Sequence, residues 1–175
     1  MSFDNAFLLA FAAALGALFW WGFRTLPGEG WQFLASTATR RNAEGEWIGV
    51  NFTFYGLFSA LAYTLAAALF VALCAAAGIA PVTAFAALAA VVAICMPASV
   101  LLVRLVEGKR HGFTVGGASF VGFLVAPAVA AAADALSEHL GTGPAPAMPF
   151  LAAMAIAYAL GESVGRLACI SFGCC

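Results

Sequence analysis

Five long apolar runs constrain the fold of this chain more than any other feature. They cover residues 6–23, 52–79, 81–106, 113–136 and 148–172, and polar residues gather between them. A run of about 18 apolar residues or more can cross a hydrocarbon core of about 30 Å as an α-helix. In lipid the backbone must satisfy its own hydrogen bonds, which leaves helices or closed barrels, and barrel strands would show alternating segments of about 10 residues instead. The sequence therefore predicts an all-α polytopic transmembrane helical bundle with about five spans.

Composition and charge exclude a water-soluble domain. Hydrophobic residues make up 65% of the 175 residues and charged residues only 9%, and the mean hydropathy is +1.03. A soluble domain is about 45–50% apolar and about 25% charged, so this chain has too little charge to cover a surface in water. The net charge of −1 points to neither a nucleic-acid nor an acidic partner, and no nucleic-acid partner is expected for an integral membrane chain. Because no internal repeat or linker stands out, residues 1–175 are predicted to form a single integral membrane domain.

The flanks of the apolar runs predict an orientation in the membrane. Residues 1–5 carry no positive charge, and no small-residue cleavage site precedes Arg24, so the first run is predicted to be an uncleaved span. Six of the seven Lys and Arg residues lie in or beside segments 24–50 and 107–111, which share one face if there are five spans. The positive-inside rule makes this face cytoplasmic and places the N-terminus outside. Four tryptophans lie at or near segment 24–50, as an interfacial aromatic belt would: Trp20, Trp21, Trp31 and Trp47.

A charged pair lies inside the last apolar run. Glu162 and Arg166 are four residues apart, which places both side chains on one face of a helix. A charge at mid-membrane costs about 2.5–3.5 kcal/mol on insertion scales, so such residues usually mark function. One interpretation is a neutralised structural pair, or a pair that reaches toward the interface. The other is an anion site, because arginine holds phosphate oxygens bidentately and keeps its proton, which suits a phospholipid head group.

Glycines accompany the charged residues in two places. Gly161 and Gly165 form a small-xxx-small pattern around the charged pair, which is typical of a packing seam between helices. A second cluster, at 108–112 and 116–122, stands at the entry of the fourth run. Glycine there permits close approach of a ligand to the backbone, and exposed N–H groups at a helix start can bind phosphate. A charged loop leading into a glycine-containing span explains the same pattern without a ligand.

Three of the five cysteines gather near residue 175. Cys169, Cys174 and Cys175 have the spacing Cys-x4-Cys-Cys, which matches no zinc pattern, and no histidine is near them in sequence. A thiol-redox or metal role and a purely structural role are both compatible with this spacing. Cys74 and Cys95 lie within apolar runs and are predicted to be packing residues.

Three stretches, taken in order, resemble the prolipoprotein diacylglyceryl transferase family. Phe-Thr-Phe-Tyr-Gly at 52–56 resembles the aromatic Tyr-Gly that starts the family's first core span. Gly-Gly-Ala-Ser-Phe-Val-Gly at 116–122 resembles the family's Gly-Gly-x-Ser-Phe-His-Gly stretch. Gly-Arg-Leu-Ala-Cys-Ile-Ser-Phe-Gly at 165–173 resembles its Gly-Arg-x-Gly-Asn-Phe-x-Asn-Gly signature, and the Cys-Cys that follows is similar to a divergent branch with Gly-Cys-Cys at this point. The likeness covers 51–175, so 1–50 looks like an additional span and loop, and only the Gly-Arg signature is reasonably specific.

The resemblance implies a function. It implies transfer of a diacylglyceryl group from the phospholipid phosphatidylglycerol to the lipobox cysteine thiol of a prolipoprotein, in the bacterial inner (cytoplasmic) membrane, without a cofactor or metal. By position, Arg166 would hold the phosphate and stabilise the departing glycerol phosphate, with Glu162 as its partner, and Tyr55 would line the lipid site. The remaining substrate-binding positions would be Gly116, Gly117, Ser119, Gly165 and Cys169. The chemistry also needs a base, since the thiolate is the nucleophile.

The chain departs from the family pattern at three positions. Val121, Cys169 and Cys174 stand where the family has His, Asn and Glu, so His111, ten residues before Val121, is the candidate base. The family has seven spans and opens its head-group motifs to the outer face, whereas the Lys and Arg distribution turns them toward the cytoplasm. Because the sequence stops within the branch signature, we expect the 51–175 core to be incomplete. Three alternatives remain open: a non-catalytic lipid-binding membrane scaffold of the same fold, a membrane thiol or redox protein that uses the C-terminal cysteines, and a transporter. A transporter would need more polar residues along a path than one Glu–Arg pair.

Overall fold

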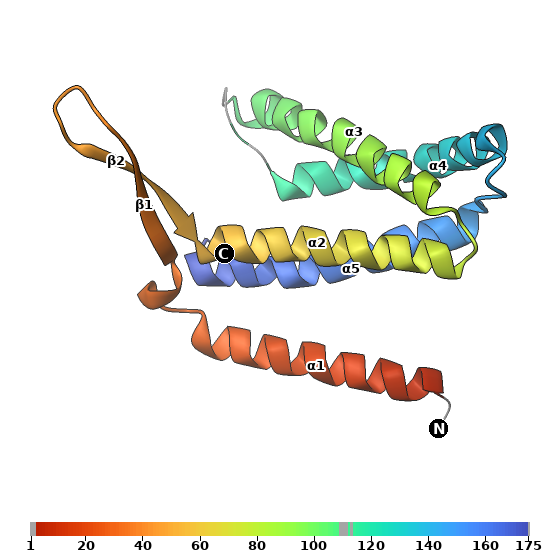
Figure 1. The fold of residues 1–175 in the computed structure, drawn as a ribbon, viewed down its shortest axis with the longest axis horizontal. Coiled ribbons are helices and arrows are strands. Elements are labelled where there is room, and N and C mark those ends of the chain that lie inside the picture. Colours follow the sequence, from red (N-terminus) through yellow and green to blue (C-terminus); the bar gives the residue numbers. More distant parts are fainter. Residues whose placement is uncertain (1–2, 109–111, 113, 175) are drawn as a thin grey trace. The chain divides into compact units, whose positions relative to one another are not determined.

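The computed structural model describes residues 3–108, 112 and 114–174 (Figure 1). Within these residues, five helices are long and apolar enough to cross a membrane. They are α1 (Phe3–Thr25), α2 (Phe54–Ala76), α3 (Pro81–Glu107), α4 (Val115–Leu140) and α5 (Ala147–Phe172). The predicted all-α class and number of spans are confirmed.

The helix ends follow local sequence signals and shift some predicted boundaries. Proline at the first position of α3 needs no hydrogen-bond partner for its nitrogen, and α3 ends where Gly108 adopts a φ of 67°. The predicted fourth run stops at 136, but α4 continues to Leu140, and its cap at Gly141 donates its N–H to the carbonyls of Ser137 and Glu138. The predicted second run began at 52, whereas α2 begins only at Phe54 because the two residues before it belong to a strand.

The segment predicted as a polar loop between the first two spans contains regular structure. A 3-10 helix, η1 (Glu29–Trp31), is followed by strands β1 (Phe33–Arg41) and β2 (Trp47–Thr53), which pair antiparallel as a two-stranded hairpin. At its turn, the backbone N–H of Glu46 donates to Asn42 Oδ1 at 2.7 Å, and Gly45 takes a φ of 83°. The apolar–polar alternation of β2 was the available signal, since a strand repeats every two residues.

The described chain forms two compact units. Helices α2 and α5 are each divided between the two units. Unit 1 comprises Met1–Leu65 and Ala159–Cys175, and unit 2 comprises Ala66–Tyr158. Unit 1 therefore holds α1, η1, the hairpin, the first part of α2 and the last part of α5. Unit 2 holds α3, α4 and the remaining parts of α2 and α5. The prediction of a single membrane domain stays a prediction.

The core of unit 1 joins the end of α1 to α2 and α5. Its buried members are Leu26, Phe58, Leu167 and Ala168. Gly22 makes this packing close, because a Cβ at this position would lie 2.5 Å from Leu167 Cδ2. A small residue at a helix contact lets two backbones approach in lipid, where van der Waals packing has to hold helices together.

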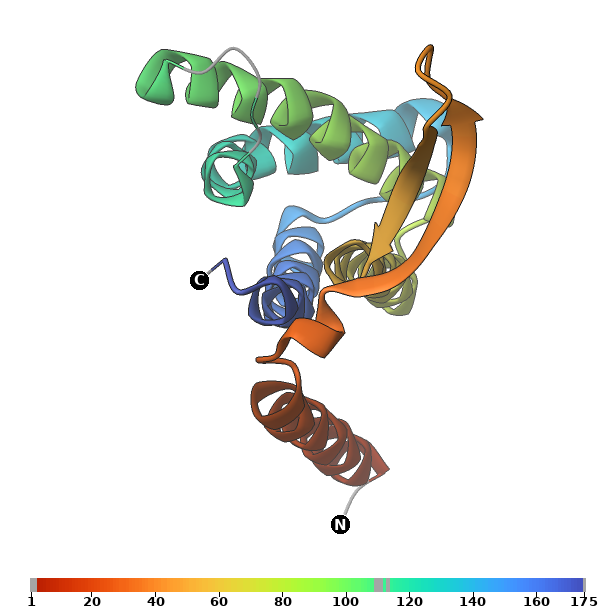
Figure 2. The ribbon, with the colours of Figure 1, turned by 90° about the vertical axis from the view of Figure 1, so that its left-hand side faces the viewer.

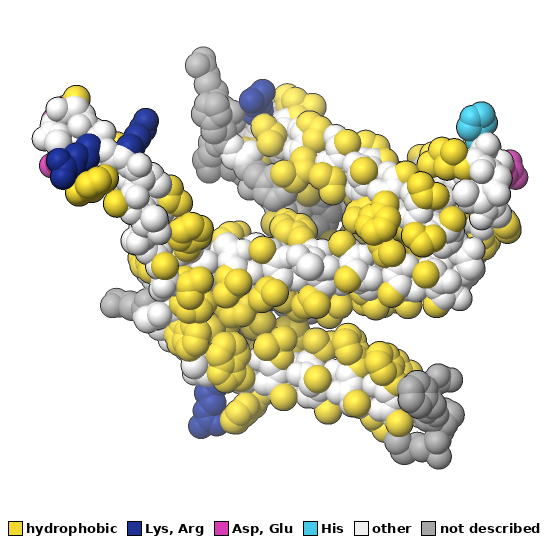
Figure 3. Space-filling view, in the orientation of Figure 1, with side chains coloured by type: hydrophobic (Ala, Val, Ile, Leu, Met, Phe, Trp, Pro, Cys, Tyr) yellow, Lys and Arg dark blue, Asp and Glu magenta, His cyan; other side chains and the backbone are white. Residues whose placement is uncertain are grey.

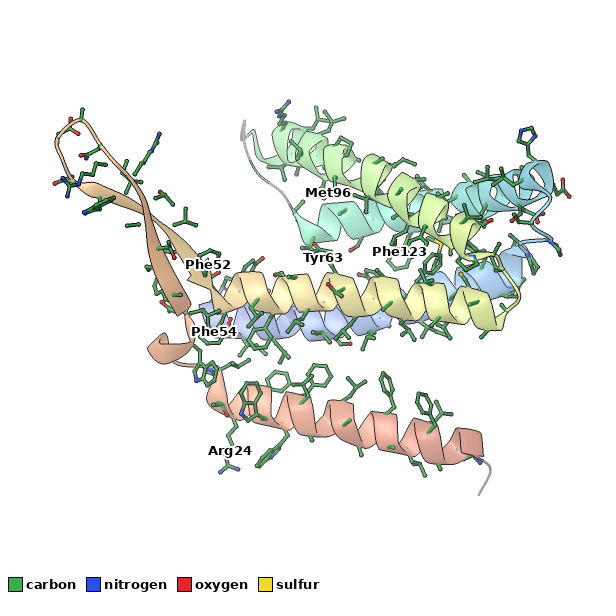
Figure 4. All side chains as sticks on the ribbon, in the orientation of Figure 1. Arg24, Phe52, Phe54, Tyr63, Met96 and Phe123 are labelled. Carbon is green, nitrogen blue, oxygen red and sulfur yellow. The ribbon has the colours of Figure 1, made fainter. Side chains whose placement is uncertain are left out.

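Aromatic rings extend this core to the start of the hairpin. The rings of Trp21 and Trp31 meet edge to face with centroids 5.5 Å apart, and Trp31 packs on Phe54 at 4.9 Å. Arg24, at the end of α1, stacks over Trp20 at 5.3 Å from the ring centroid (Figure 4). These contacts place aromatic and basic side chains together where the first two spans emerge from the apolar region, as the predicted interfacial belt requires.

Unit 2 is built on small residues and two phenylalanines. Phe70 and Phe150 are buried and meet at right angles, with ring centroids 5.4 Å apart. Alanines from α3, α4 and α5 fill the space around them: Ala84, Ala87, Ala130, Ala133, Ala153 and Ala157. Thr83 of α3 and Ser137 of α4 share a buried hydrogen bond of 2.8 Å between their hydroxyl oxygens.

We expect Thr83→Val to lower the free energy of unfolding by about 0.6–1.7 kcal/mol, the range found for hydrogen bonds between membrane helices. Valine keeps the shape but leaves the Ser137 hydroxyl without this partner. Thr64→Val is the matched control, because the Thr64 hydroxyl donates only to the Ala60 carbonyl of its own helix. Denaturant titration in detergent micelles measures both variants. Equal stability of the two would contradict a contribution from the α3–α4 bond.

Candidate functional site

The charged pair of α5 is formed in the structure. Arg166 Nη2 donates to Glu162 Oε1 at 2.5 Å. The glutamate side chain is 29% exposed and the arginine side chain 62% exposed, so the guanidinium remains accessible from outside the unit. Both residues lie within the membrane-spanning part of α5. An accessible ion pair in an apolar span is costly unless polar groups cover it.

The pair lies in the C-terminal half of the span, with Glu162 near its middle and Arg166 about 10 Å from the midpoint. At about 1.5 Å per residue, Glu162 lies about 4 Å along the axis from the midpoint of α5. Side chains on a helix lean toward its N-terminus, and the bond to Glu162 holds the Arg166 guanidinium in that direction. An arginine that reached for the nearer interface would point the other way. The guanidinium is thus held toward Glu162 and away from the C-terminal end of α5.

The face of α5 that carries Glu162 and Arg166 also leads to a hollow at the end of the helix. Cys169 lies three residues after Arg166, on the same face. Within unit 1, Cys169, Ile170, Ser171 and Gly173 line one side of a hollow of about 540 Å³. The other side is lined by the end of α1 and the segment that follows it, through Phe23, Pro27, Gly28 and Gln32. The volume is in the range of small-molecule sites.

The last cysteine that the structure describes turns back toward Cys169. The backbone N–H of Cys174 donates to the Cys169 carbonyl at 3.3 Å, and its Sγ lies 3.8 Å from the same oxygen. Cys169 is half-buried and Cys174 is exposed. The end of α5 thus places two thiols beside the hollow.

Tyr55 and Gly165, both predicted site residues, are packed within unit 1. The ring of Tyr55 at the start of α2 meets Phe172 at the end of α5, with centroids 5.7 Å apart. A Cβ at Gly165 would lie 3.9 Å from Ala62 Cβ, so this glycine faces α2. Gly165 thus contributes to a helix contact one residue from Arg166.

The other predicted positions lie elsewhere in the chain. Gly116, Gly117 and Ser119 occupy the first turns of α4 and belong to unit 2. A Cβ on Gly117 would lie 2.8 Å from Thr114 Cγ2 and 3.3 Å from Leu102 Cδ1, so a packing role accounts for this glycine. The candidate base His111 lies outside the described residues.

Gly116→Ala and Gly117→Ala separate a packing glycine from an unconstrained one. Both changes gain about 1 kcal/mol of helix propensity, but only Gly117 has side chains within 3.4 Å of the new methyl group. We expect Gly117→Ala to be less stable than Gly116→Ala by about 1–3 kcal/mol, the usual cost of overpacking. Thermal unfolding in the same detergent measures the difference. Equal stabilities would show that α4 shifts freely against α3.

Sequence reasoning missed Asp134, an acidic residue inside the fourth apolar run. Its Oδ1 accepts a hydrogen bond of 2.9 Å from the backbone N–H of Ala145, and the residue is half-buried. The bond ties the connection between α4 and α5 to α4. A single carboxylate within an apolar span was the available signal, and the contact assigns it a structural role.

Polar groups in the described interior are satisfied. Across residues 3–108 and 114–174, no buried side-chain nitrogen or oxygen lacks a hydrogen-bond partner. In the same part of the chain, no three His, Cys, Asp or Glu side chains converge as metal ligands would. The unusual polar feature is thus the accessible ion pair on α5.

Comparisons with protein-family models, with curated proteins and with solved structures give no match for this chain. The function proposed below therefore depends on the residues and their geometry, together with the motif resemblance described above.

Proposed function

We propose that this membrane protein is a phospholipid-dependent transferase, which moves a diacylglyceryl group from phosphatidylglycerol to a thiol such as a prolipoprotein cysteine. The observation that carries the proposal is the accessible Arg166–Glu162 pair within a membrane span. A phospholipid phosphate brought to this arginine would supply the polar cover that hydrocarbon cannot. The Gly-Arg resemblance at 165–173 supports the same assignment of Arg166.

The transfer step requires a cation at the phosphate. The acceptor thiolate forms a carbon–sulfur bond to the glyceryl carbon that carries the phosphate. The carbon–oxygen bond of that phosphoester breaks, and glycerol phosphate leaves with its electron pair. Negative charge gathers on the leaving phosphate, and preorganised donors aimed at developing charge are a main source of catalysis. Arg166 is suited to this role because its guanidinium offers paired donors and keeps its proton.

Glu162 has a positioning role in this scheme. It holds the guanidinium at 2.5 Å and neutralises it in the empty site, so the charge is not isolated in lipid. Arginine carries five N–H groups, so one guanidinium can bond a carboxylate and a phosphate together. The proton of the acceptor thiol passes to a base, for which His111 remains the candidate.

A membrane thiol protein is the second candidate function. It is favoured by Cys169, which lines the hollow, and by Cys174, whose backbone and thiol both turn to the Cys169 carbonyl. In this reading the α5 end would undergo reversible thiol oxidation, and the ion pair would be structural.

The deciding experiment is a transfer assay with purified protein in lipid. Phosphatidylglycerol labelled in its diacylglyceryl part is offered with a lipobox peptide, and mass spectrometry detects the thioether product. Phosphatidylcholine and a peptide with serine in place of the cysteine are the controls. We expect product only with phosphatidylglycerol and the thiol peptide. Folded protein that binds phosphatidylglycerol without transfer would indicate the lipid-binding scaffold, and redox-dependent labelling of Cys169 without lipid binding would indicate the thiol protein.

A further inference from the structure

The β1–β2 hairpin has two chemically different faces. In β2, Ile48, Val50 and Phe52 lie on one face, called the apolar face here, and Gly49, Asn51 and Thr53 lie with Trp47 on the other, more polar face. The register places Ala35, Thr37 and Arg40 of β1 on the apolar face, opposite Phe52, Val50 and Ile48. On the polar face, Ser36 donates a hydrogen bond of 2.7 Å to Asn51.

The apolar face has no protein against it within the described chain. Ile48, Val50 and Phe52 are 39%, 49% and 54% exposed, and every residue of β1 is exposed. Figures 1 and 2 show the hairpin extending away from α1 and η1 in both views. An isolated two-stranded hairpin is marginal in water, and a hydrophobic face needs a layer to pack against. Something outside this chain segment must therefore cover the face.

The position of the hairpin indicates what covers it. β2 runs into α2 without a linking residue, and η1 with its neighbours connects β1 to α1, so both ends of the hairpin are held at the ends of membrane spans. The Phe52 side chain extends from β2 on the side along which α2 runs (Figure 4). Hydrophobic side chains continue along the hairpin in the space-filling view (Figure 3). The apolar face is thus turned toward the bilayer that α2 enters.

The polar groups of the hairpin match a membrane interface. Arg41 stacks over the Trp47 ring at 4.7 Å from its centroid, near the tip. Arg40, opposite Ile48 on the apolar face, has a long apolar stem that can lie along lipid while its charge stays at the head-group level. The turn itself is polar, with Glu44 and Glu46 beside the two arginines. A water-facing tip above an apolar face is the pattern of an element that lies in the interface plane.

We propose that the hairpin lies on the lipid surface, with the face formed by Ile48, Val50 and Phe52 inserted among the head groups and the face of Ser36 and Asn51 in water. The partner is the surface of the same bilayer that the spans cross. This inference is independent of the transferase proposal, because it concerns residues outside the α5 site.

An environment-sensitive fluorophore on a single cysteine tests the orientation of the hairpin. In the full chain with its native cysteines changed to alanine, Val50→Cys places the label on the apolar face and Ala38→Cys on the polar face of the same hairpin. The probe surface is a phosphatidylcholine vesicle with or without lipids that carry a nitroxide quencher. We expect blue-shifted emission and nitroxide quenching at position 50, and quenching by aqueous iodide at position 38.

Two other results would overturn the proposal. Equal iodide quenching at both positions would place the whole hairpin in water. Protection at position 50 from both quenchers would mean that protein covers this face, such as a second copy of the chain. A photo-crosslinking amino acid at position 50, with every native cysteine retained, repeats the test without the cysteine changes. Lipid adducts are the expected product, and crosslinked dimers would again refute the lipid surface.

Discussion

Arg166→Ala should reduce diacylglyceryl transfer by on the order of 10²-fold or more, the loss seen when one donor to a developing anion is removed. The change also leaves Glu162 as an unpaired carboxylate in an apolar span. Arg166→Lys should restore charge but not activity, because the compact ammonium cannot form the paired bonds of a guanidinium. The measurement is the initial rate of transfer at saturating phosphatidylglycerol for each variant.

Matched variants show whether the loss is specific to this arginine. Arg24→Ala removes another arginine of unit 1 that stacks on Trp20 at the end of α1, and it should leave the transfer rate within about twofold, as expected for a surface change. Glu162→Gln keeps an oxygen acceptor for Arg166 and should reduce the rate less than Arg166→Ala. Wild-type transfer by Arg166→Lys would refute the phosphate-holding role.

Phe150→Ala should produce the largest loss of stability, about 2 kcal/mol or more. Phe150 is 0% exposed in unit 2 and meets Phe70 edge to face, so its removal leaves a cavity that rigid helices cannot fill. In water such changes cost about 3–5 kcal/mol. In lipid the transfer part of that cost is missing, because hydrocarbon is as apolar as the core, and the lost packing remains.

Phe85→Ala is the control for this prediction. Phe85 lies on α3 in the same unit and is 59% exposed, so alanine there creates no internal cavity. Unfolding titrations in mixed micelles should show a change of about 0.5 kcal/mol or less for it. If both phenylalanines gave the same loss, the buried position of Phe150 would carry no special packing energy.

The hairpin shows where reasoning from sequence failed. Residues 24–50 were interpreted as a polar loop because charges, glycines and proline gather there. The apolar–polar alternation at 47–53 is short, and its apolar members lie on a face that packs against no other part of the described chain. Strand pairing joins residues of two different segments, here Arg41 with Trp47 and Phe33 with Thr53. Local composition does not show that pairing.

Part of the candidate site was likewise predicted from the sequence and part was not. The Glu162–Arg166 pair was predicted and is formed, because an i,i+4 contact depends only on helical geometry. The hollow beside Cys169 was not predicted, because its other wall comes from the end of α1 and the segment after it. Gly117, taken as a ligand-binding position, packs against Leu102 and Thr114. A glycine that admits a ligand and one that admits a neighbouring helix are alike in sequence.

The sequence by itself determined that this protein is solvated by lipid, that its fold class is all-α and that it has five helices able to span a membrane. Apolar runs of this length are stable only in lipid, and lipid obliges each run to form its own backbone hydrogen bonds, so helices follow from local composition. Tertiary structure alone decided which faces of the helices meet. Hydrocarbon is as apolar as the side chains, so hydrophobicity does not distinguish an inward face from an outward one. Close contacts such as Gly22 with Leu167 and bonds such as Thr83 with Ser137 make that choice, and they exist only once the helices are packed.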